Sequence, residues 1–327
     1  MEDEEQELKK ILTKQHYKLV GKHSGVQTCR WTKNSLRDEG SCYKEKFYGI
    51  KSHLCCQMSP VIGFCQNRCL HCWRAIELTI GKEMNKNNID NPSEIIDGCI
   101  KAQQKLLEGF KGNPKANKEK LKESDEPMQF AISLTGEPTL YPKLGELVKE
   151  LRNRGKTSFI VTNGLKPDEL EYLHNNNCLP TQLYFSLNSP NEDLYNKWHR
   201  SQEKDAWKKF NQTLEIFPTL STRKVIRMTL IKGENNNMKD EFIKDYVELI
   251  KRSNPDFIEV KGFMSVGFSR QRKGMGYESM PTHKDIQEFS VKLAKKLNLK
   301  ILDEHEFSRV VLIGNDKEKM KIKKEEI

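Results

Sequence analysis

The chain has 327 residues, with 56 lysines and arginines against 46 acidic residues, which gives a net charge of +10. A chain of this length can bury a large core without disulfide staples, and it contains no apolar run long enough to cross a membrane. Residues 2–5 are all acidic, which argues against a secretory signal. We therefore expect a cytoplasmic protein with reduced thiols and no membrane association.

The first 57 residues, which we interpret as an N-terminal extension, carry three evenly spaced cysteines. Cys29, Cys42 and Cys55 are each thirteen residues apart, and Cys56 stands beside the last of them. Reduced, clustered cysteines in a cytoplasmic chain are more often metal ligands than disulfide partners. Their spacing alone is equally compatible with zinc and with an iron–sulfur cluster.

A more specific motif follows the first expected strand, residues 58–64. Cys65, Cys69 and Cys72 have C-x3-C-x2-C spacing on one tight loop. Three such thiolates can each bind one iron of a 4Fe–4S cluster and leave the fourth iron open. An open iron can chelate S-adenosylmethionine, whose one-electron cleavage generates a radical. A structural zinc site would need a further pair of ligands, and none follows at a suitable distance.

Strand-like and helix-like segments alternate from residue 58 onward, as in a parallel sheet covered by helices. The expected strands are 58–64, 128–134, 157–162, 182–187, 224–231 and 257–262, with two further strand-like segments at 299–303 and 309–313. The expected helices are 93–110, 144–154, 168–175, 206–216, 239–252 and 283–297. Six units predict an α/β fold, a partial (β/α)6 barrel related to the eight-fold TIM barrel, spanning residues 58–265. Residues 266–327 would add a basic loop, a helix and a sheet extension within the same continuous domain.

Two further features of the sequence are interpreted as structural rather than functional. The charged segment 111–126 contains proline and glycine and is expected to form a solvated insertion. Cys99 and Cys178 stand alone in helix-like sequence and are interpreted as core residues.

Polar residues follow or close several of the expected strands, and the carboxyl ends of barrel strands meet at one rim. We expect a site there that contacts S-adenosylmethionine. The candidate residues are Thr135, Gly136, Glu137, Asn163, Ser186, Asn188 and Thr229. Glu137 and the carbonyls before it could accept from the ammonium group, while serine and asparagine suit the ribose hydroxyls and the carboxylate. The alternative for Glu137 is a carboxylate at a helix start, where the helix dipole favours it.

Basic residues gather with glycine and aromatics in a loop after the sixth strand, residues 265–277, and in residues 197–200. Such loops can contact phosphates and stack on bases, although a lysine-rich surface would give the same net charge. The candidates for RNA contact are Arg270, Arg272, Lys273, Tyr277 and Trp198.

The residues together resemble a known family. The loop ending at Cys72, with Thr135–Gly136–Glu137 standing where radical S-adenosylmethionine enzymes carry a Gly-Gly-Glu-like motif, resembles that superfamily. Within it, the segment 42–60, the thirteen-residue cysteine spacing and the Cys72–Trp73–Arg74 ending resemble the tRNA 4-demethylwyosine synthases. The resemblance extends from about residue 17 to residue 313 and is closest to the single-domain form, without the flavodoxin-like domain of eukaryotic members. It implies an external electron donor of the flavodoxin or ferredoxin type.

The resemblance also implies a reaction. These enzymes convert N1-methylguanosine, the purine 3′ of the anticodon of phenylalanine tRNA, to 4-demethylwyosine by adding two carbons of pyruvate as a third ring. A deoxyadenosyl radical takes a hydrogen from the N1-methyl group, and the resulting carbon radical attacks pyruvate, whose carboxyl carbon is lost.

By the same resemblance, Cys29, Cys42 and Cys55 bind a second 4Fe–4S cluster whose open iron could hold pyruvate. Lys44 stands at the position proposed to form a Schiff base with pyruvate, and the alternative is a surface lysine. His71 stands where the superfamily often has an aromatic near the adenine, and Cys56 is either a buried neighbour or a substitute ligand. We expect a monomer.

Two other functions are compatible with part of the sequence. A radical S-adenosylmethionine maturase acting on a small molecule or a peptide would share the Cys65 loop and the barrel, but it has no reason to carry the upstream cysteine series. A non-catalytic RNA-binding protein stabilised by metal would explain the charge and the cysteines together.

Overall fold

A single mixed sheet forms the centre of the computed structural model, which describes residues 2–326, with side chains from residue 4 onward. Within that range the strand order is β1-β2-β3-β4-β5-β6-β7-β8-β10-β9. The six parallel strands are β3 (Cys55–Ser59), β4 (Gln129–Ile132), β5 (Thr157–Thr162), β6 (Gln182–Ser186), β7 (Arg223–Leu230) and β8 (Phe257–Gly262). The antiparallel edge strands are β1 (Lys18–Val20) and β2 (Ser24–Val26) on one side, and β10 (Val310–Gly314) and β9 (Lys300–His305) on the other. The predicted partial barrel with a C-terminal sheet extension is confirmed.

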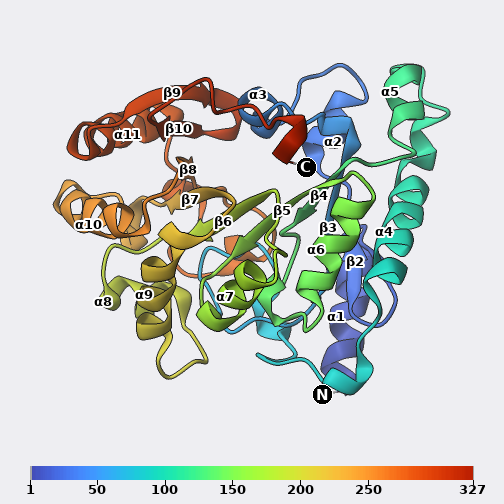
Figure 1. Cartoon of the computed structure of the whole chain (residues 1–327), viewed down its shortest axis with the longest axis horizontal. Coiled ribbons are helices and arrows are strands. Elements are labelled where there is room, and N and C mark those ends of the chain that lie inside the picture. The colour runs from blue at the N-terminus through green and yellow to red at the C-terminus, as the bar shows by residue number, and fades with distance from the viewer. Residues whose placement is uncertain (1, 327) are drawn as a thin grey trace.

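Helices follow the parallel strands and cover one face of the sheet (Figure 1). They are α4 (Pro92–Leu107), α6 (Leu144–Asn153), α7 (Pro167–Asn175), α9 (Ala206–Ile216), α10 (Ile243–Ser253) and α11 (His283–Leu297). Ile160, Phe185 and Ile226 point from neighbouring strands into the core beneath these helices. Because side chains alternate along a strand, Phe159, Tyr184 and Val225 point to the opposite face.

The opposite face is covered by shorter elements from both ends of the chain. Helix α3 (Tyr43–Tyr48) packs there with Met320 in a second apolar cluster, and the Ile322 amide donates to the Tyr48 carbonyl (3.0 Å). Burial on both faces explains why the central strands are almost continuously apolar.

The first strand begins earlier than predicted. The segment 58–64 was expected to be a strand, but β3 ends at Ser59 and residues 60–64 form a loop. Pro60 has no amide to donate to a sheet, and Gly63 has φ +84°, a turn conformation. Both Cys55 and Cys56 therefore lie in β3.

Sequence analysis also missed several helices within the described range. These are α1 (Glu2–Lys14), α2 (Arg30–Ser35), α3, α5 (Lys118–Glu123) and α8 (Glu192–His199). Helix α5 lies in the 111–126 insertion, which is otherwise largely exposed as predicted. Cys99 and Cys178 are both buried core residues, although Cys178 follows helix α7 rather than lying in it. No helix in the described part of the chain is long and apolar enough to cross a membrane.

Candidate active site

The loop of residues 65–72 is fixed by backbone hydrogen bonds to the end of helix α8. The amides of Arg68 and Leu70 donate to the carbonyls of His199 and Trp198, at 2.8 and 2.9 Å. The loop conformation therefore depends on a segment more than one hundred residues away in the sequence.

Cys65, Cys69 and Cys72 line one cavity of about 170 Å³. Leu8 and Leu12 of helix α1 also line it, so the N-terminal helix covers the cysteine loop. Burial raises the pKa of the Cys65 thiol to about 12, which keeps it protonated until a metal displaces the proton.

Three cysteines that line one cavity are the ligands that a 4Fe–4S cluster with one open iron needs. No three His, Cys, Asp or Glu side chains among residues 4–326 are arranged to hold one metal ion. Ligands to one zinc must converge on a point, whereas thiolates that each bind a different iron need not.

The Thr135–Gly136–Glu137 turn closes another side of the same cavity, through Thr135 and Gly136. Gly136 has φ +73°, and a side chain there would collide with the carbonyls of Val61 and Phe64. The sequence therefore needs glycine at this position to let the turn approach the cysteine loop.

The Glu137 carboxylate, by contrast, is buried and does not line the cavity. It caps a short helical turn by accepting from the Thr139 amide and hydroxyl, and it also accepts from the Thr162 hydroxyl and the Asn163 amide, both at 2.7 Å. Burial raises its pKa, and these hydrogen bonds oppose that rise. The carboxylate thus stands at the start of a short helical turn, the alternative considered for it, and its contact with the ammonium group stays a prediction.

The remaining rim candidates lie at the carboxyl ends of β5, β6 and β7. The Asn163 side-chain amide donates to Gln66 in the cysteine loop (3.1 Å). Asn188 is buried, and its side-chain oxygen accepts from the Thr229 amide (2.8 Å). Ser186 ends β6 and is half-buried. The structure thus brings Asn163 to the cysteine loop and joins the other two strand ends to each other.

The upstream cysteines come together at the N-termini of three neighbouring elements. Cys29 precedes helix α2, Cys42 precedes helix α3, and Cys55 begins β3. Burial raises the pKa of Cys42 to about 12, and the nearby Cys29 thiol contributes to that rise. Cys56 points to the other sheet face, into the core, so it is a buried neighbour rather than a substitute ligand.

Lys44 is buried beside this second triad, with only 8% of the residue exposed. Its Nζ lies 4.5 Å from the ring centroid of Tyr184 and 4.8 Å from that of Phe159. Burial lowers the pKa of Lys44, and the nearby Glu259 carboxylate opposes that effect. Lys44 is therefore not a surface lysine.

Sequence analysis missed a group of charged residues that surrounds Lys44. Glu259 is fully buried and accepts from the hydroxyls of Tyr43 (3.0 Å) and Tyr48 (2.7 Å). Arg227 pairs with Glu259 in the strand register. Burial lowers the pKa of Lys261 to about 8, and its Nζ donates to the Ser308 carbonyl (2.8 Å). The sequence does carry a signal for this group, because the charged residues Glu259 and Lys261 stand at alternating positions of a strand that is otherwise apolar.

Arg272 has a different role from the RNA contact predicted for it. Its guanidinium donates to the carbonyls of Leu70 (3.2 Å), Cys72 and Arg74 (2.8 Å), and forms an ion pair with Glu77 (2.9 Å). Only 9% of the side chain is exposed. Because its donors are used inside the protein, the prediction of a phosphate contact is wrong, and Arg272 instead holds the end of the cysteine loop.

Trp198 is also unavailable to RNA. It is fully buried in an apolar cluster with Leu70, Phe263 and Met275, so it cannot offer a ring face to a base. His71 packs near it, with ring centroids 5.6 Å apart, and does not line the cavity of the cysteine loop.

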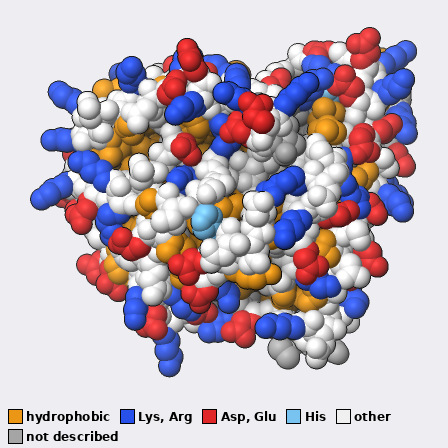
Figure 2. Space-filling model, in the orientation of Figure 1, with side chains coloured by type: hydrophobic (Ala, Val, Ile, Leu, Met, Phe, Trp, Pro, Cys, Tyr) orange, Lys and Arg blue, Asp and Glu red, His pale blue; other side chains and the backbone are white. Residues whose placement is uncertain are grey.

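The other candidates for RNA contact are at the surface. Arg270 and Tyr277 are exposed, and the Lys273 side chain is 90% exposed. Their loop packs on Trp73 of the cysteine loop, since the Phe268 amide donates to the Trp73 carbonyl (3.1 Å). Basic and acidic side chains are interspersed on the face shown in Figure 2, so the net charge forms no continuous basic patch on it.

An open groove of about 910 Å³ lies beside the upstream cysteines. Cys29 lines it, and so does Trp73, which also lines the cavity of Cys65, Cys69 and Cys72. Its further lining includes the cations Arg30, Lys33 and Arg37 and the aromatics Trp31 and Phe307.

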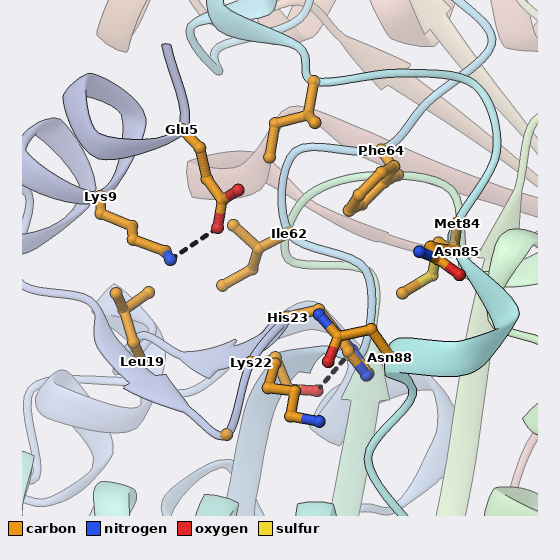
Figure 3. Close-up of a pocket in the computed structure, with 13 residues that line it drawn as sticks. Glu5, Lys9, Leu19, Lys22, His23, Ile62, Phe64, Met84, Asn85 and Asn88 are labelled. Carbon is orange, nitrogen blue, oxygen red and sulfur yellow. Dashed lines mark hydrogen bonds and ion pairs between the residues drawn. The ribbon is translucent and has the colours of Figure 1, made fainter. Parts of the chain in front are cut away.

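A smaller pocket of about 110 Å³ lies beside the cysteine loop, where helix α1 meets the loop segments (Figure 3). Glu5 and Lys9 of helix α1 form an ion pair there (2.6 Å) and face Ile62 and Phe64. None of the cysteines or predicted site residues lines it.

Comparison with known proteins agrees with this geometry. The radical SAM superfamily model matches residues 59–246, and a model described as wyosine base formation matches residues 252–315. The chain is 46% identical over 312 residues to the S-adenosyl-L-methionine-dependent tRNA 4-demethylwyosine synthase of Pyrococcus abyssi, covering 95% of this chain and 89% of that protein. The chain belongs to the tRNA 4-demethylwyosine synthase family.

Other members of the family match over most of the chain. The Methanocaldococcus jannaschii enzyme of the same name is 36% identical over 319 residues, covering 96% of this chain and 98% of the relative. The mouse enzyme is 38% identical, and the match covers 96% of this chain but 42% of that longer protein. A crystal structure of archaeal TYW1 has a TM-score of 0.76 at 32% identity, covering 97% of this chain and 98% of that one. Another structure, of TYW1 with a lysine–pyruvate adduct bound, has a TM-score of 0.83 at 34% identity and the same coverage.

The family and the enzyme class predicted from the sequence are thereby confirmed. The chain is a radical S-adenosylmethionine enzyme, with the 4Fe–4S cluster that this superfamily uses. Its family name also identifies tRNA as the class of substrate. The alternatives of a peptide or small-molecule maturase and of a non-catalytic RNA-binding protein do not fit this membership.

Proposed function

We propose that the chain converts N1-methylguanosine next to the anticodon of phenylalanine tRNA, together with pyruvate, to 4-demethylwyosine, and releases methionine and 5′-deoxyadenosine. The observation that carries this proposal is the groove between the two cysteine regions. Trp73 lines both the groove and the cavity of the first triad, so a base in the groove would lie near Cys29 and next to that cavity.

Cys65, Cys69 and Cys72 would hold the cluster that binds S-adenosylmethionine, which supplies a deoxyadenosyl radical on one-electron reduction. Thr135 and Gly136 line the same cavity and would contact the methionine part of the cofactor. The rim residues Asn163, Ser186, Asn188 and Thr229 would lie along its ribose and adenine. The cavity is lined largely by apolar and half-buried groups, which would exclude water from the radical.

The second triad fits a second 4Fe–4S cluster. Cys29, Cys42 and Cys55 are three thiols with no local fourth cysteine in the described part of the chain, since Cys56 points into the core. Lys44 would bind pyruvate as an imine, because its burial lowers its pKa and so favours the nucleophilic neutral amine. A lysine–pyruvate adduct in the solved relative supports this assignment.

The electron for cofactor cleavage would come from a flavodoxin- or ferredoxin-type protein in the cytoplasm. We also propose that the chain acts as a monomer. Its exposed large apolar side chains, among residues 4–326, belong to separate elements rather than to one obvious patch, as on many monomeric proteins.

Nucleoside mass analysis tests the reaction. The protein, reconstituted anaerobically with iron and sulfide and then reduced, should convert N1-methylguanosine in phenylalanine tRNA to 4-demethylwyosine when pyruvate is present. With 13C-pyruvate the product should keep carbons 2 and 3 and lose carbon 1. Cleavage of S-adenosylmethionine without any tRNA product, using correctly methylated tRNA, would contradict the proposal.

We propose that Arg270 and Lys273 contact the phosphates of the tRNA and that Tyr277 stacks on a base. Arg270→Ala with Lys273→Ala should weaken tRNA binding and lower the slope of log affinity against log salt by about 0.7 to 0.9 for each phosphate that is no longer neutralised. Iron content should be unchanged. Affinity measured between low and moderate salt checks this, and a slope equal to that of the parent protein would show that the loop is not a docking surface.

Arg272→Ala is the matched comparison on the same loop. Because Arg272 holds the cysteine loop, this variant should lose iron or melt at a lower temperature, and its salt slope should stay unchanged.

A further inference from the structure

Arg74 is a buried cation without a hydrogen-bond partner in the described part of the chain. The residue is 7% exposed, and none of its three guanidinium nitrogens donates to an acceptor among residues 4–326. It lines the cavity of about 170 Å³ together with Cys65, Cys69 and Cys72. A buried charge without a counter-charge is costly, so this position calls for an anion from outside these residues.

Aromatic side chains lie beside the Arg74 guanidinium. The Arg74 Cζ lies over the Trp73 ring, 2.9 Å from its centroid, and over the Tyr17 ring, 5.4 Å from its centroid, where a cation is favoured. Because none of its N–H groups has an acceptor among residues 4–326, they are available to a ligand in the cavity that Arg74 lines. The Tyr17 hydroxyl beside it is buried and also has no hydrogen-bond partner among residues 4–326.

A carboxylate matches these donors in shape and charge. A guanidinium pairs with a carboxylate through two parallel hydrogen bonds, and the pair is stronger where water is excluded. Leu8 and Leu12 of helix α1 cover the cavity and limit the access of water to it.

Two carboxylates belong to the reaction proposed above, those of S-adenosylmethionine and of pyruvate. Arg74 follows Cys72 by two residues and shares the cavity of the first triad, whereas Lys44 stands with the second triad. We propose that Arg74 binds the carboxylate of S-adenosylmethionine and thereby orients its methionine part. This inference rests on the proposed function for the identity of the two ligands.

Binding measurements on the reconstituted, unreduced protein test this without turnover. Equilibrium dialysis would compare S-adenosylmethionine with its decarboxylated analogue, which lacks only the carboxylate. Arg74→Met should bind S-adenosylmethionine at least about tenfold more weakly and bind the analogue nearly as the parent does. Arg74→Lys, which keeps the charge but not the paired donors, should lose part of the discrimination. Arg154→Met removes a surface arginine already paired with Asp97 and Glu150 and should change neither affinity.

Other roles for Arg74 predict different outcomes of these binding measurements. Equal weakening for both compounds, in Arg74→Met and in Arg74→Lys, would assign Arg74 to structure and overturn the inference. Loss of pyruvate binding alone would assign its partner to pyruvate, and loss of tRNA binding alone would assign it to a phosphate; either overturns the inference. If Arg74→Met fails to fold, full discrimination in Arg74→Lys would also overturn it. Formation of 4-demethylwyosine by the parent protein tests the proposed function independently. If the parent forms it, these outcomes concern Arg74 alone.

Discussion

Replacing Cys65, Cys69 and Cys72 together by alanine is expected to abolish the formation of methionine and 5′-deoxyadenosine. These thiols line one cavity, and each would bind a separate iron of the cluster that reduces S-adenosylmethionine. Iron should fall from about eight to about four atoms per chain, because two 4Fe–4S clusters hold about eight. Iron analysis and chromatography of the cleavage products measure both quantities.

The second triad provides the matched control. Alanine at Cys29, Cys42 and Cys55 should also halve the iron, yet leave some uncoupled cleavage of S-adenosylmethionine, because that cofactor binds at the other triad. Cys56→Ala should keep all of the iron, since Cys56 lies in the core on the opposite sheet face. Unchanged cleavage in the first triple variant would refute the radical assignment, and a protein holding only zinc would refute both clusters.

The strands and long helices could be predicted because each carries its own signal. Strands β5 and β8 and helices α9 and α11 occupy the predicted residues, since apolar, β-branched segments or 3.6-residue periodicity end at clear turn residues. Helices α2 and α3, by contrast, have six residues each, too few to be stable alone. Their stability comes from packing, which a local pattern does not contain.

The residues of the candidate site also fall into those that carry a local sequence signal and those whose position depends on packing. Spacing singled out Cys65, Cys69 and Cys72 because they stand on one short loop, and the structure places all three on one cavity. The burial of a side chain could not be predicted from the sequence. Arg272 and Trp198 stand in segments expected to be exposed, yet Arg272 donates to carbonyls about 200 residues away and Trp198 fills an apolar cluster. The hydrogen bonds that Glu137 accepts from Thr162 and Asn163 were likewise not visible in the sequence, since both residues stand at the end of another strand.

The charged residues around Lys44 carry a signal in the sequence, but their contact with Lys44 depends on packing. Arg227, Glu259 and Lys261 occupy alternating positions of β7 and β8, a visible signal of polar groups directed to one sheet face. That Lys44 meets them follows only from the packing of α3 across that face. Its position two residues past Cys42 could be predicted from the sequence, but its burial could not.

Lys44→Arg is expected to remove 4-demethylwyosine formation while S-adenosylmethionine cleavage continues. Arginine keeps the positive charge near Glu259 but cannot form an imine with pyruvate. Lys46→Arg is the matched control, because Lys46 lies on the same short helix but is half-exposed and paired with Asp303 (2.7 Å). Nucleoside analysis beside deoxyadenosine measurement separates the two steps. Full activity in Lys44→Arg would reduce Lys44 to an electrostatic role.

Borohydride trapping identifies which lysine carries pyruvate. Reduction in the presence of pyruvate should fix the imine as a stable mass adduct on the peptide that contains Lys44. Lys261 is the competitor on the same sheet face, since burial lowers its pKa to about 8 and makes it a competent nucleophile. Its Nζ is already held by the Ser308 carbonyl (2.8 Å), whereas no hydrogen-bond partner of the Lys44 Nζ is found among the described residues, where it lies over two aromatic rings. We therefore expect the adduct on Lys44 alone, and an adduct on Lys261 that persists in Lys44→Arg would transfer the role to that residue.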